Sequence, residues 1–204
     1  MLRGLQGVVM HQLARRGGVH VFRVFHRRLE SAARWRMPPD YAIGVMTLDE
    51  VLAECRHPAL ELSETGVRAA YARGGLCIGA RQRGELVGYA WFAFDPAPHL
   101  DGVWVQVPPQ AIYRYKAFVR PAHRGKGLAP AMYRYADGAL ADRGRESVVN
   151  CIATHNLASI AASLSSGARP LGHLAYWRSA RRFLSFHSRA VRQLGLRFYL
   201  ASSS

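Results

Sequence analysis

The fold is most restricted by residues 111–143, where an apolar run, a basic glycine loop and a helical pattern follow one another. Ala111–Val119 reads as a strand, and residues 130–143 have the apolar spacing of a helix. The loop between them contains RGKGLA (124–129), although a simple turn needs only one glycine. This order places free backbone N–H groups at the positive end of the helix dipole. The loop is therefore either a basic turn or a cradle for an anion such as a phosphate.

The spacing of the two glycines separates this loop from two well-known phosphate loops. The chain has no GxxxxGK[ST] pattern here, and Pro130 occupies the place of the third glycine of GxGxxG. A pyrophosphate held without magnesium fits the pattern better than a γ-phosphate that is transferred.

The composition indicates one globular domain in a reducing compartment. The 204 residues are 50% hydrophobic, which is enough for one core. The three cysteines lie far apart, and no Cys or His spacing suggests zinc. We therefore expect free thiols, no bound metal and a cytoplasmic location. No apolar run approaches the roughly 18 residues of a membrane span.

The positive charge is concentrated at the two ends of the chain. Of the formal net charge of +15, residues 1–36 carry +7, residues 177–204 carry +6 and the stretch between them only +2. A nucleic-acid-binding fold more often spreads its charge over one face, so nucleic acid is disfavoured as a partner. The basic ends suit an acyl carrier protein or an anionic membrane surface, which adds a peripheral membrane location as an alternative.

Residues 1–36 are predicted to be a basic amphipathic helical extension. Leu2, Leu5, Val9 and Leu13 have helical spacing, and after Gly17-Gly18 the pattern resumes at residues 19–29. Such a helix packs on its own domain or on a second copy in a homodimer, or it lies on lipid. The two prolines of MPPD (37–40) end it, so the main domain is predicted to cover residues 37–204.

The rest of the chain predicts a mixed α/β (α+β) fold around a largely antiparallel sheet flanked by helices. Strands are expected at 41–46, 76–81, 85–94, 111–119, 147–153, 170–177 and 196–200. Helices are expected at 48–55 after an N-cap at Thr47, at 63–73, 130–143 and 157–165. Periodicity does not decide between helix and strand for the segment that precedes the last strand.

A second motif lies about thirty residues after the loop, in HNLASIAASLSSGA (155–168). An Asn at a strand end opens a helix there, and Gly167 ends it. With both motifs in this order, the sequence resembles the GNAT superfamily of acyl-CoA N-acyltransferases. RGKGLA matches the [Q/R]-x-x-G-x-[G/A] loop of that family, and Asn156, Ser159, Ile160 and Gly167 match its Asn-x-x-Ala/Ser…Gly motif.

The resemblance implies a co-substrate, acetyl-CoA or another acyl-CoA, and direct transfer of the acyl group to an amine in a ternary complex. The loop amides would hold the pyrophosphate, the strand edge at 118–120 would pair with the pantetheine, and Asn156 would face the thiol end. The implied cofactor-binding residues are Phe118, Val119, Arg120, Arg124, Gly125, Lys126, Gly127, Leu128, Ala129 and Asn156.

The catalytic groups are less well defined. Where the family often has a Tyr that protonates the leaving thiolate, this chain has Ser163, whose hydroxyl can still hydrogen-bond the sulfur. The strand before the loop contains no acid or histidine, so the candidates for the general base are His155, Tyr115, and a water chain or a distant acid such as Glu61. Strand alternation predicts Tyr115 on one face of that strand and Lys116 on the other.

The acceptor is expected to be a small-molecule amine. The segments that shape the acceptor site in the family, and the strand beside them, carry carboxylates suited to a cationic amine together with three large aromatic residues: Glu54, Glu61, Glu64, Asp95 and Asp101, with Tyr71, Trp91 and Trp104. Three alternatives stay open: a macromolecular acceptor such as a protein or an aminoacyl-tRNA, an acyl donor carried by acyl carrier protein, and a CoA-binding module without catalysis.

Overall fold

The computed structural model describes residues 18–30, 37–100, 102–179 and 182–200. Most strands form one sheet with the order β10-β9-β1-β8-β7-β4-β3-β2, and a second, three-stranded sheet has the order β11-β6-β5. All recorded pairings are antiparallel except that of β7 with β8. The strands are β1 Val19–Arg28, β2 Ala42–Met46, β3 Leu76–Gln82, β4 Glu85–Ala93, β5 Ala97–Pro98, β6 Val103–Gln106, β7 Ala111–Val119, β8 Ser147–Ala153, β9 Arg169–Arg178, β10 Phe183–His187 and β11 Arg197–Leu200.

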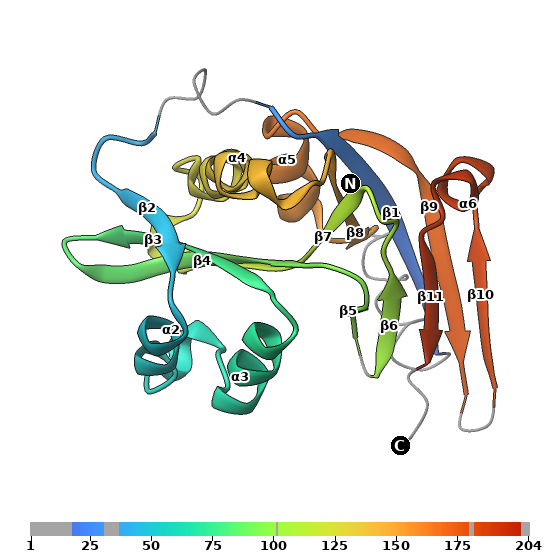
Figure 1. The fold of residues 1–204 in the computed structure, drawn as a ribbon, viewed down its shortest axis with the longest axis horizontal. Helices are drawn as coiled ribbons and strands as arrows, with labels where there is room; N and C mark the ends of the chain where they lie inside the picture. Colours follow the sequence, from blue (N-terminus) through green and yellow to red (C-terminus); the bar gives the residue numbers. More distant parts are fainter. Residues whose placement is uncertain (1–17, 31–36, 101, 180–181, 201–204) are drawn as a thin grey trace, which may run out of the picture.

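Helices cover both faces of the large sheet (Figure 1). The α-helices are α2 Leu48–Glu54, α3 Glu64–Ala72, α4 Leu128–Leu140, α5 Leu157–Ser165 and α6 Arg189–Leu194, with short 3-10 turns at Pro58–Leu60, Pro121–His123 and Ala141–Arg143. Figure 1 shows α4 and α5 above the sheet and α2 and α3 below it. The fold is therefore the mixed, mostly antiparallel α/β architecture that the sequence predicts.

The two faces of the large sheet bury separate cores. On the α4 face, Leu128, Met132 and Leu140 pack against Ile112 and Phe92 of the strands. On the opposite face, an aromatic and aliphatic cluster joins the large sheet to the three-stranded sheet, and another joins it to α2 and α3. Side chains of strand β7 alternate between the two cores: Tyr113 enters one and Ile112 the other.

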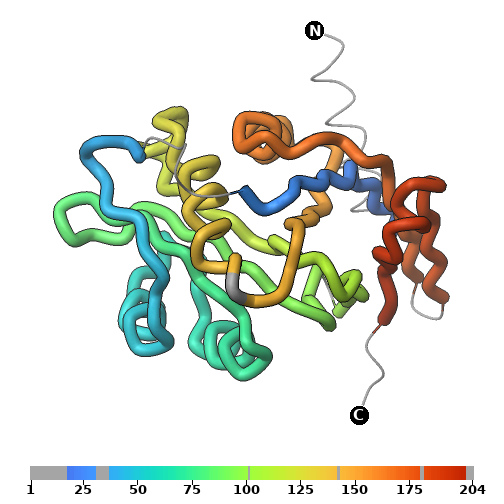
Figure 2. Tube along the Cα trace, turned by 45° about the horizontal axis from the view of Figure 1, so that its top comes forward, coloured from blue at the N-terminus to red at the C-terminus, as the bar shows by residue number. Residues whose placement is uncertain are grey.

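The helical prediction for residues 19–29 is wrong, because Val19–Arg28 forms the inner strand β1. This strand pairs with β8 on one side and β9 on the other, and Figure 2 shows it in blue beside these late segments. Its apolar residues fit an alternating pattern as well as a helical one: Phe22 and Val24 enter one core, and Phe25 enters the core under α5. Pairing with distant strands decides between the two patterns. Residues 1–17 and 31–36 of the predicted extension lie outside the described residues.

The predicted elements near local signals are confirmed. Thr47 caps α2 in a capping box with Glu50, and β3 and β4 form a hairpin in which Arg83 and Gly84 both have positive φ. The undecided segment after β9 holds β10 and then α6. Strand β6 was not predicted, since it has only four residues between a polar loop and prolines.

A buried ion pair fixes β1 to α4. The Arg27 guanidinium binds the Asp137 carboxylate with both terminal nitrogens; Nη2 lies 2.7 Å from Oδ1, and Nη1 contacts Oδ2. Nη2 also donates to the Tyr133 carbonyl at 3.1 Å. Both side chains are almost fully buried. Removing one partner would leave the other charge buried without compensation.

We expect Asp137→Asn to lower the free energy of unfolding by about 3–5 kcal/mol. The matched control is Glu30→Gln, which removes the exposed end of an ion pair with Arg134 and should cost about 0–1 kcal/mol. Urea unfolding followed by circular dichroism measures both. Equal costs for the two variants would contradict the importance of the buried pair.

A histidine lies inside the aromatic core between the two sheets. His99 Nδ1 is 2.8 Å from the Tyr113 hydroxyl, and the His99 ring lies 4.6 Å from that of Phe22 and 4.5 Å from that of Phe198. Burial, with a smaller effect of His20, lowers the pKa of His99 from 6.5 to about 3. The neutral ring is therefore the form that the folded protein holds.

The unfolded chain binds a proton at His99 below pH 6.5, whereas the folded protein does so only near pH 3. The contribution of His99 to the free energy of unfolding is thus complete above pH 6.5. It falls as the pH drops from 6.5 toward 3, by at most about 1.4 kcal/mol per pH unit. We expect His99→Gln to have a lower free energy of unfolding than the parent at neutral pH. Between pH 6.5 and pH 3 it should lose less stability than the parent does. Urea midpoints over a pH series test this, and parallel curves for the two proteins would contradict it.

Candidate functional site

A cavity of about 620 Å³ opens where β7 and β8 separate. The two parallel strands pair only from Ala111 to Tyr113 of β7. Beyond that point Ala117 and Val119 line the cavity, and the first turns of α4 and α5 form its walls. The β7 edge that faces the cavity is thus available to pair with an extended ligand as an added strand would.

The glycine loop places a row of free backbone donors at the cavity. Gly125 and Gly127 have φ values of 77° and 76°, a left-handed conformation that residues with a side chain rarely adopt. Gly127 is the N-cap of α4, and its carbonyl accepts the first helical hydrogen bond, from Ala131. Within the described residues, the N–H groups of 125–129 donate to no backbone carbonyl. This arrangement, together with the α4 dipole, suits an anion such as a pyrophosphate.

Most residues predicted to bind CoA line this cavity. They are Val119, Arg124, Gly125, Gly127, Leu128, Ala129 and Asn156. The other three do not line it: the Phe118 ring stacks on Tyr89 on the other face of the sheet, Arg120 pairs with Glu85 at 2.8 Å, and Lys126 is exposed. Arg124 Nε donates to the Val119 carbonyl at 3.0 Å, which ties the loop to the end of β7.

Helix α5 contributes a wall of small side chains that sequence reasoning missed. Its cavity-lining residues are Ala158, Ser159, Ala161, Ala162 and Ser165. Their spacing follows one face of a helix, so the run of Ala and Ser was a usable signal. Asn156 caps this helix, with its side-chain oxygen accepting from the Ser159 N–H at 3.1 Å. Tyr133 of α4 and His123 of the preceding turn also line the cavity and were not predicted.

Ser163 does not reach the cavity. Its hydroxyl is fully buried and accepts a hydrogen bond from Arg114 Nη2 at 2.6 Å. The Arg114 guanidinium lies 3.5 Å from the ring centre of Tyr133, and burial lowers its pKa. Ser163 therefore holds a buried cation behind the cavity wall, and this position argues against contact between its hydroxyl and a thiolate.

A β-bulge changes the face on which Lys116 lies. Trp91 of β4 is opposite Lys116 and Phe92 is opposite Arg114, so Tyr115 is an extra residue on β7. As a result Tyr115 and Lys116 both point away from the cavity. Tyr115 stacks on Trp91, and Lys116 Nζ donates to the Glu61 carbonyl at 2.6 Å. The prediction that Tyr115 and Lys116 lie on opposite faces is wrong, because strand alternation assumes a regular strand.

The other two catalytic candidates occupy different places. Burial raises the pKa of Tyr115, so its phenol keeps its proton at neutral pH. His155 is exposed beside Asn156, next to the cavity but not among its lining residues. The structure thus does not bring His155, Tyr115 and Ser163 together into one group.

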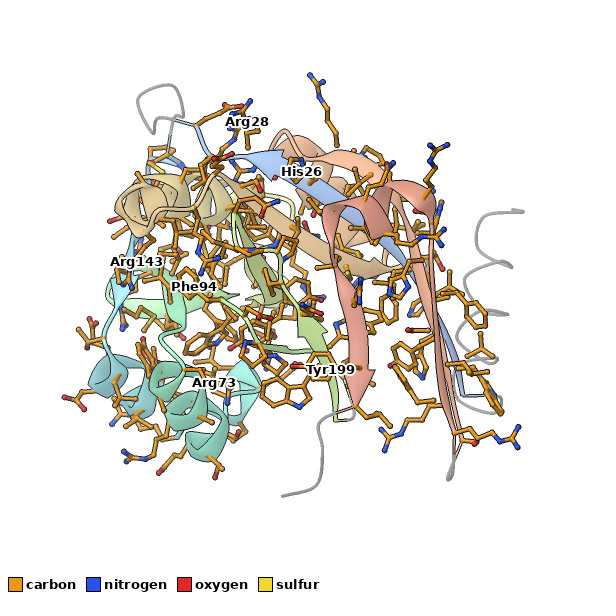
Figure 3. All side chains as sticks on the ribbon, turned by 45° about the vertical axis from the view of Figure 1, so that its right-hand side comes forward. His26, Arg28, Arg73, Phe94, Arg143 and Tyr199 are labelled. Atoms are coloured by element: carbon orange, nitrogen blue, oxygen red, sulfur yellow. The ribbon has the colours of Figure 1, made fainter. Side chains whose placement is uncertain are left out.

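The face of β7 opposite the cavity is aromatic rather than acidic. Tyr71 packs edge-on against Trp91, and the Arg73 guanidinium lies 5.2 Å from the ring centre of Trp104. Trp104 pairs with Tyr199 across β6 and β11, and Figure 3 shows Arg73 and Tyr199 on this side.

The carboxylates expected around an acceptor are dispersed. Glu54 is bound by Arg81 at 2.8 Å, Asp95 accepts from the Val107 N–H, and Glu61 and Glu64 are exposed on α3 and the loop before it. Asp101 lies outside the described residues. The acidic pattern that suggested a cationic acceptor is therefore not assembled into one group by the described part of the chain.

The described residues contain neither a metal-binding cluster nor a membrane-spanning helix. No three His, Cys, Asp or Glu side chains among them gather closely enough to hold a metal ion. Within the same ranges, no helix has the length and apolar character needed to cross a membrane.

The site thus combines a strand pair that separates, a glycine loop and a helix N-terminus. The family model of the acetyltransferase (GNAT) family matches residues 43–163. The chain belongs to this family. Members of this family generally use acetyl-CoA.

Solved structures agree on the fold. An acetyltransferase from the GNAT family of Colwellia psychrerythraea is similar with a TM-score of 0.54 and 15% identity, over 87% of this chain and 60% of that one. A GCN5-related N-acetyltransferase from Kribbella flavida has a TM-score of 0.52 and 13% identity, over 92% and 66%. This chain thus spans less than two thirds of the length of each. No curated protein matches the sequence.

We expect Ser163→Ala to lower the free energy of unfolding by about 1.5–3 kcal/mol, because the buried Arg114 loses a hydrogen-bond acceptor. The control is Ser165→Ala on the cavity wall of the same helix, which should stay within about 0.5 kcal/mol. Chemical unfolding measures both. Unchanged stability of Ser163→Ala would contradict the structural role.

Proposed function

We propose that this protein is an acyl-CoA-dependent N-acyltransferase that transfers an acetyl group directly from acetyl-CoA to an amine. The observation that carries the proposal is the set of free N–H groups at 125–129 beside a cavity of about 620 Å³, in a chain of the GNAT family. A volume of this size suits a cofactor-sized ligand.

In this proposal the loop amides and the α4 dipole bind the pyrophosphate, and Arg124 adds charge. The open edge of β7 pairs with the pantetheine amides and leads the thioester toward the bulge at Tyr115. The thioester is already activated, so the protein chiefly positions the amine and stabilises the tetrahedral oxyanion with a β7 N–H. The transfer forms the amide bond and breaks the carbon–sulfur bond, and the leaving thiolate takes a proton from water to become the CoA thiol.

The proton steps are assigned to groups beside β7. Tyr115 lies on the face of β7 opposite the cavity and keeps its proton. It therefore does not act as the base, but its hydroxyl can donate a hydrogen bond to an acceptor molecule on that face. His155, at the open end near Asn156, accepts the amine proton directly or through water. Ser163 is left out of this scheme because Arg114 occupies its hydroxyl.

The test compares two glycine variants in calorimetric titration with acetyl-CoA, desulfo-CoA and a long-chain acyl-CoA. Gly127→Glu should abolish binding, because it puts bulk and negative charge at the pyrophosphate position. Gly144→Glu is the matched control: Gly144 also has positive φ and open space around it, but it does not line the cavity. It should bind like the parent protein.

Thiol release is then measured over a panel of amines and peptides, with product masses to identify acylated nitrogen. Absence of binding by any acyl-CoA, or equal binding by the two variants, would overturn the proposal. Binding without turnover on any amine would instead identify a CoA-binding module, and preference for the long-chain donor would exclude acetyl transfer.

A further inference from the structure

The last part of the chain contains no acidic residue. After Glu146 there is neither Asp nor Glu, whereas seven arginines follow. This segment forms β8, α5, β9, β10, α6 and β11. Strand β1, which lies between β8 and β9, adds Arg23, Arg27 and Arg28. One end of the sheet is therefore built almost entirely from cationic and neutral residues.

The same part of the chain exposes large apolar side chains. Leu184 and Phe186 on the edge strand β10 are 50% and 61% exposed, and Leu157 and Leu164 on α5 are 57% and 47% exposed. Exposed apolar side chains are ordinary when they are scattered, but a group of them beside one another marks an interaction surface.

Strand register places Leu184 and Phe186 within a continuous apolar area. Leu184 is opposite Trp177 and Phe186 is opposite Ala175 on β9, and these in turn are opposite Val19 and Val21 of β1. We call these six residues the β10 face. Figure 1 shows β10 and β9 at the end of the sheet farthest from β2.

The β10 face lies on the α5 side of the sheet and adjoins a cation. Phe22 and Val24 enter the core with β6 and β11, whereas Phe25 packs under Ile160 of α5. Alternation along β1 therefore puts Val19, Val21 and Arg23 on the α5 side. Arg23 is half-buried and opposite His173, at the border of the apolar area.

We propose that the β10 face is a docking surface for a membrane that contains anionic lipids. Leu184 and Phe186 would enter the headgroup layer, and Arg23 at the border of the face would bind a lipid phosphate. The chain has no Asp or Glu after Glu146, which favours an anionic lipid surface as the partner. The exposure of Leu184 and Phe186 within the described part of the chain favours lipid over nucleic acid, which offers these side chains little to bind. Leu157 and Leu164 are exposed on α5, which packs on the same side of the sheet.

The test uses the full chain in co-sedimentation with vesicles of phosphatidylcholine alone or mixed with phosphatidylglycerol. We expect binding to the anionic vesicles that weakens with salt. The double variant Leu184→Ser/Phe186→Ser should bind roughly tenfold or more weakly. Its control is Val45→Ser, which removes a 48% exposed side chain from β2, the opposite edge strand of the sheet, and should bind like the parent.

A charge reversal tests the electrostatic part separately. Arg23→Glu should weaken vesicle binding roughly fivefold or more, whereas Arg83→Glu in the β3–β4 hairpin should not. Circular dichroism and calorimetric titration with acetyl-CoA show whether each variant is folded, independently of lipid.

Three results would overturn the proposal. The first is absence of binding to anionic vesicles. The second is unchanged binding by the double variant, which would mean that the β10 face is covered by another segment of this chain or is not used. The third is loss of a dimer in the double variant with lipid binding unchanged, which would make the face an interface between two copies.

Discussion

The organisation of the candidate site depends on the short pairing between β7 and β8. These parallel strands hold together for three residues and then separate. If they stayed paired, the β7 edge would be occupied and the space between α4 and α5 would close. The separation instead exposes strand edge, loop amides and helix N-terminus to one cavity. The candidate site thus arises from hydrogen bonds that the sheet leaves unmade.

Buried charges hold the elements around this opening. Arg27 and Asp137 join β1 to α4, and Arg114 joins β7 to Tyr133 of α4 and Ser163 of α5. Each contact is directional and links two elements of the fold. Ion pairs of this kind add little net stability, but they define one arrangement of the helices. The cavity shape therefore rests on polar contacts behind its walls.

The sequence was most informative where structure is decided locally. Strands β7 and β8 and helix α5 begin and end where predicted, because prolines, glycines and an Asn cap mark their ends. Most of the predicted cofactor residues line the cavity for the same reason. Three features depended on distant contacts and were missed: β1 as a strand, the bulge at Tyr115, and the burial of Ser163 under Arg114. The carboxylates were also not predictable from sequence, since tertiary packing gives Glu54 to Arg81 and Asp95 to the Val107 N–H.

The position of β1 also has a consequence for how the protein folds during synthesis. This strand leaves the ribosome early, but it pairs with β8 and β9, which are made near the end; Phe25, for example, lies opposite Asn150. Closing such a long loop is slow, and pairing must wait until the chain is nearly complete. Until then a strand with two unpaired edges and five apolar residues is exposed, and the arginines and histidines that alternate with them keep such an edge from pairing with other chains.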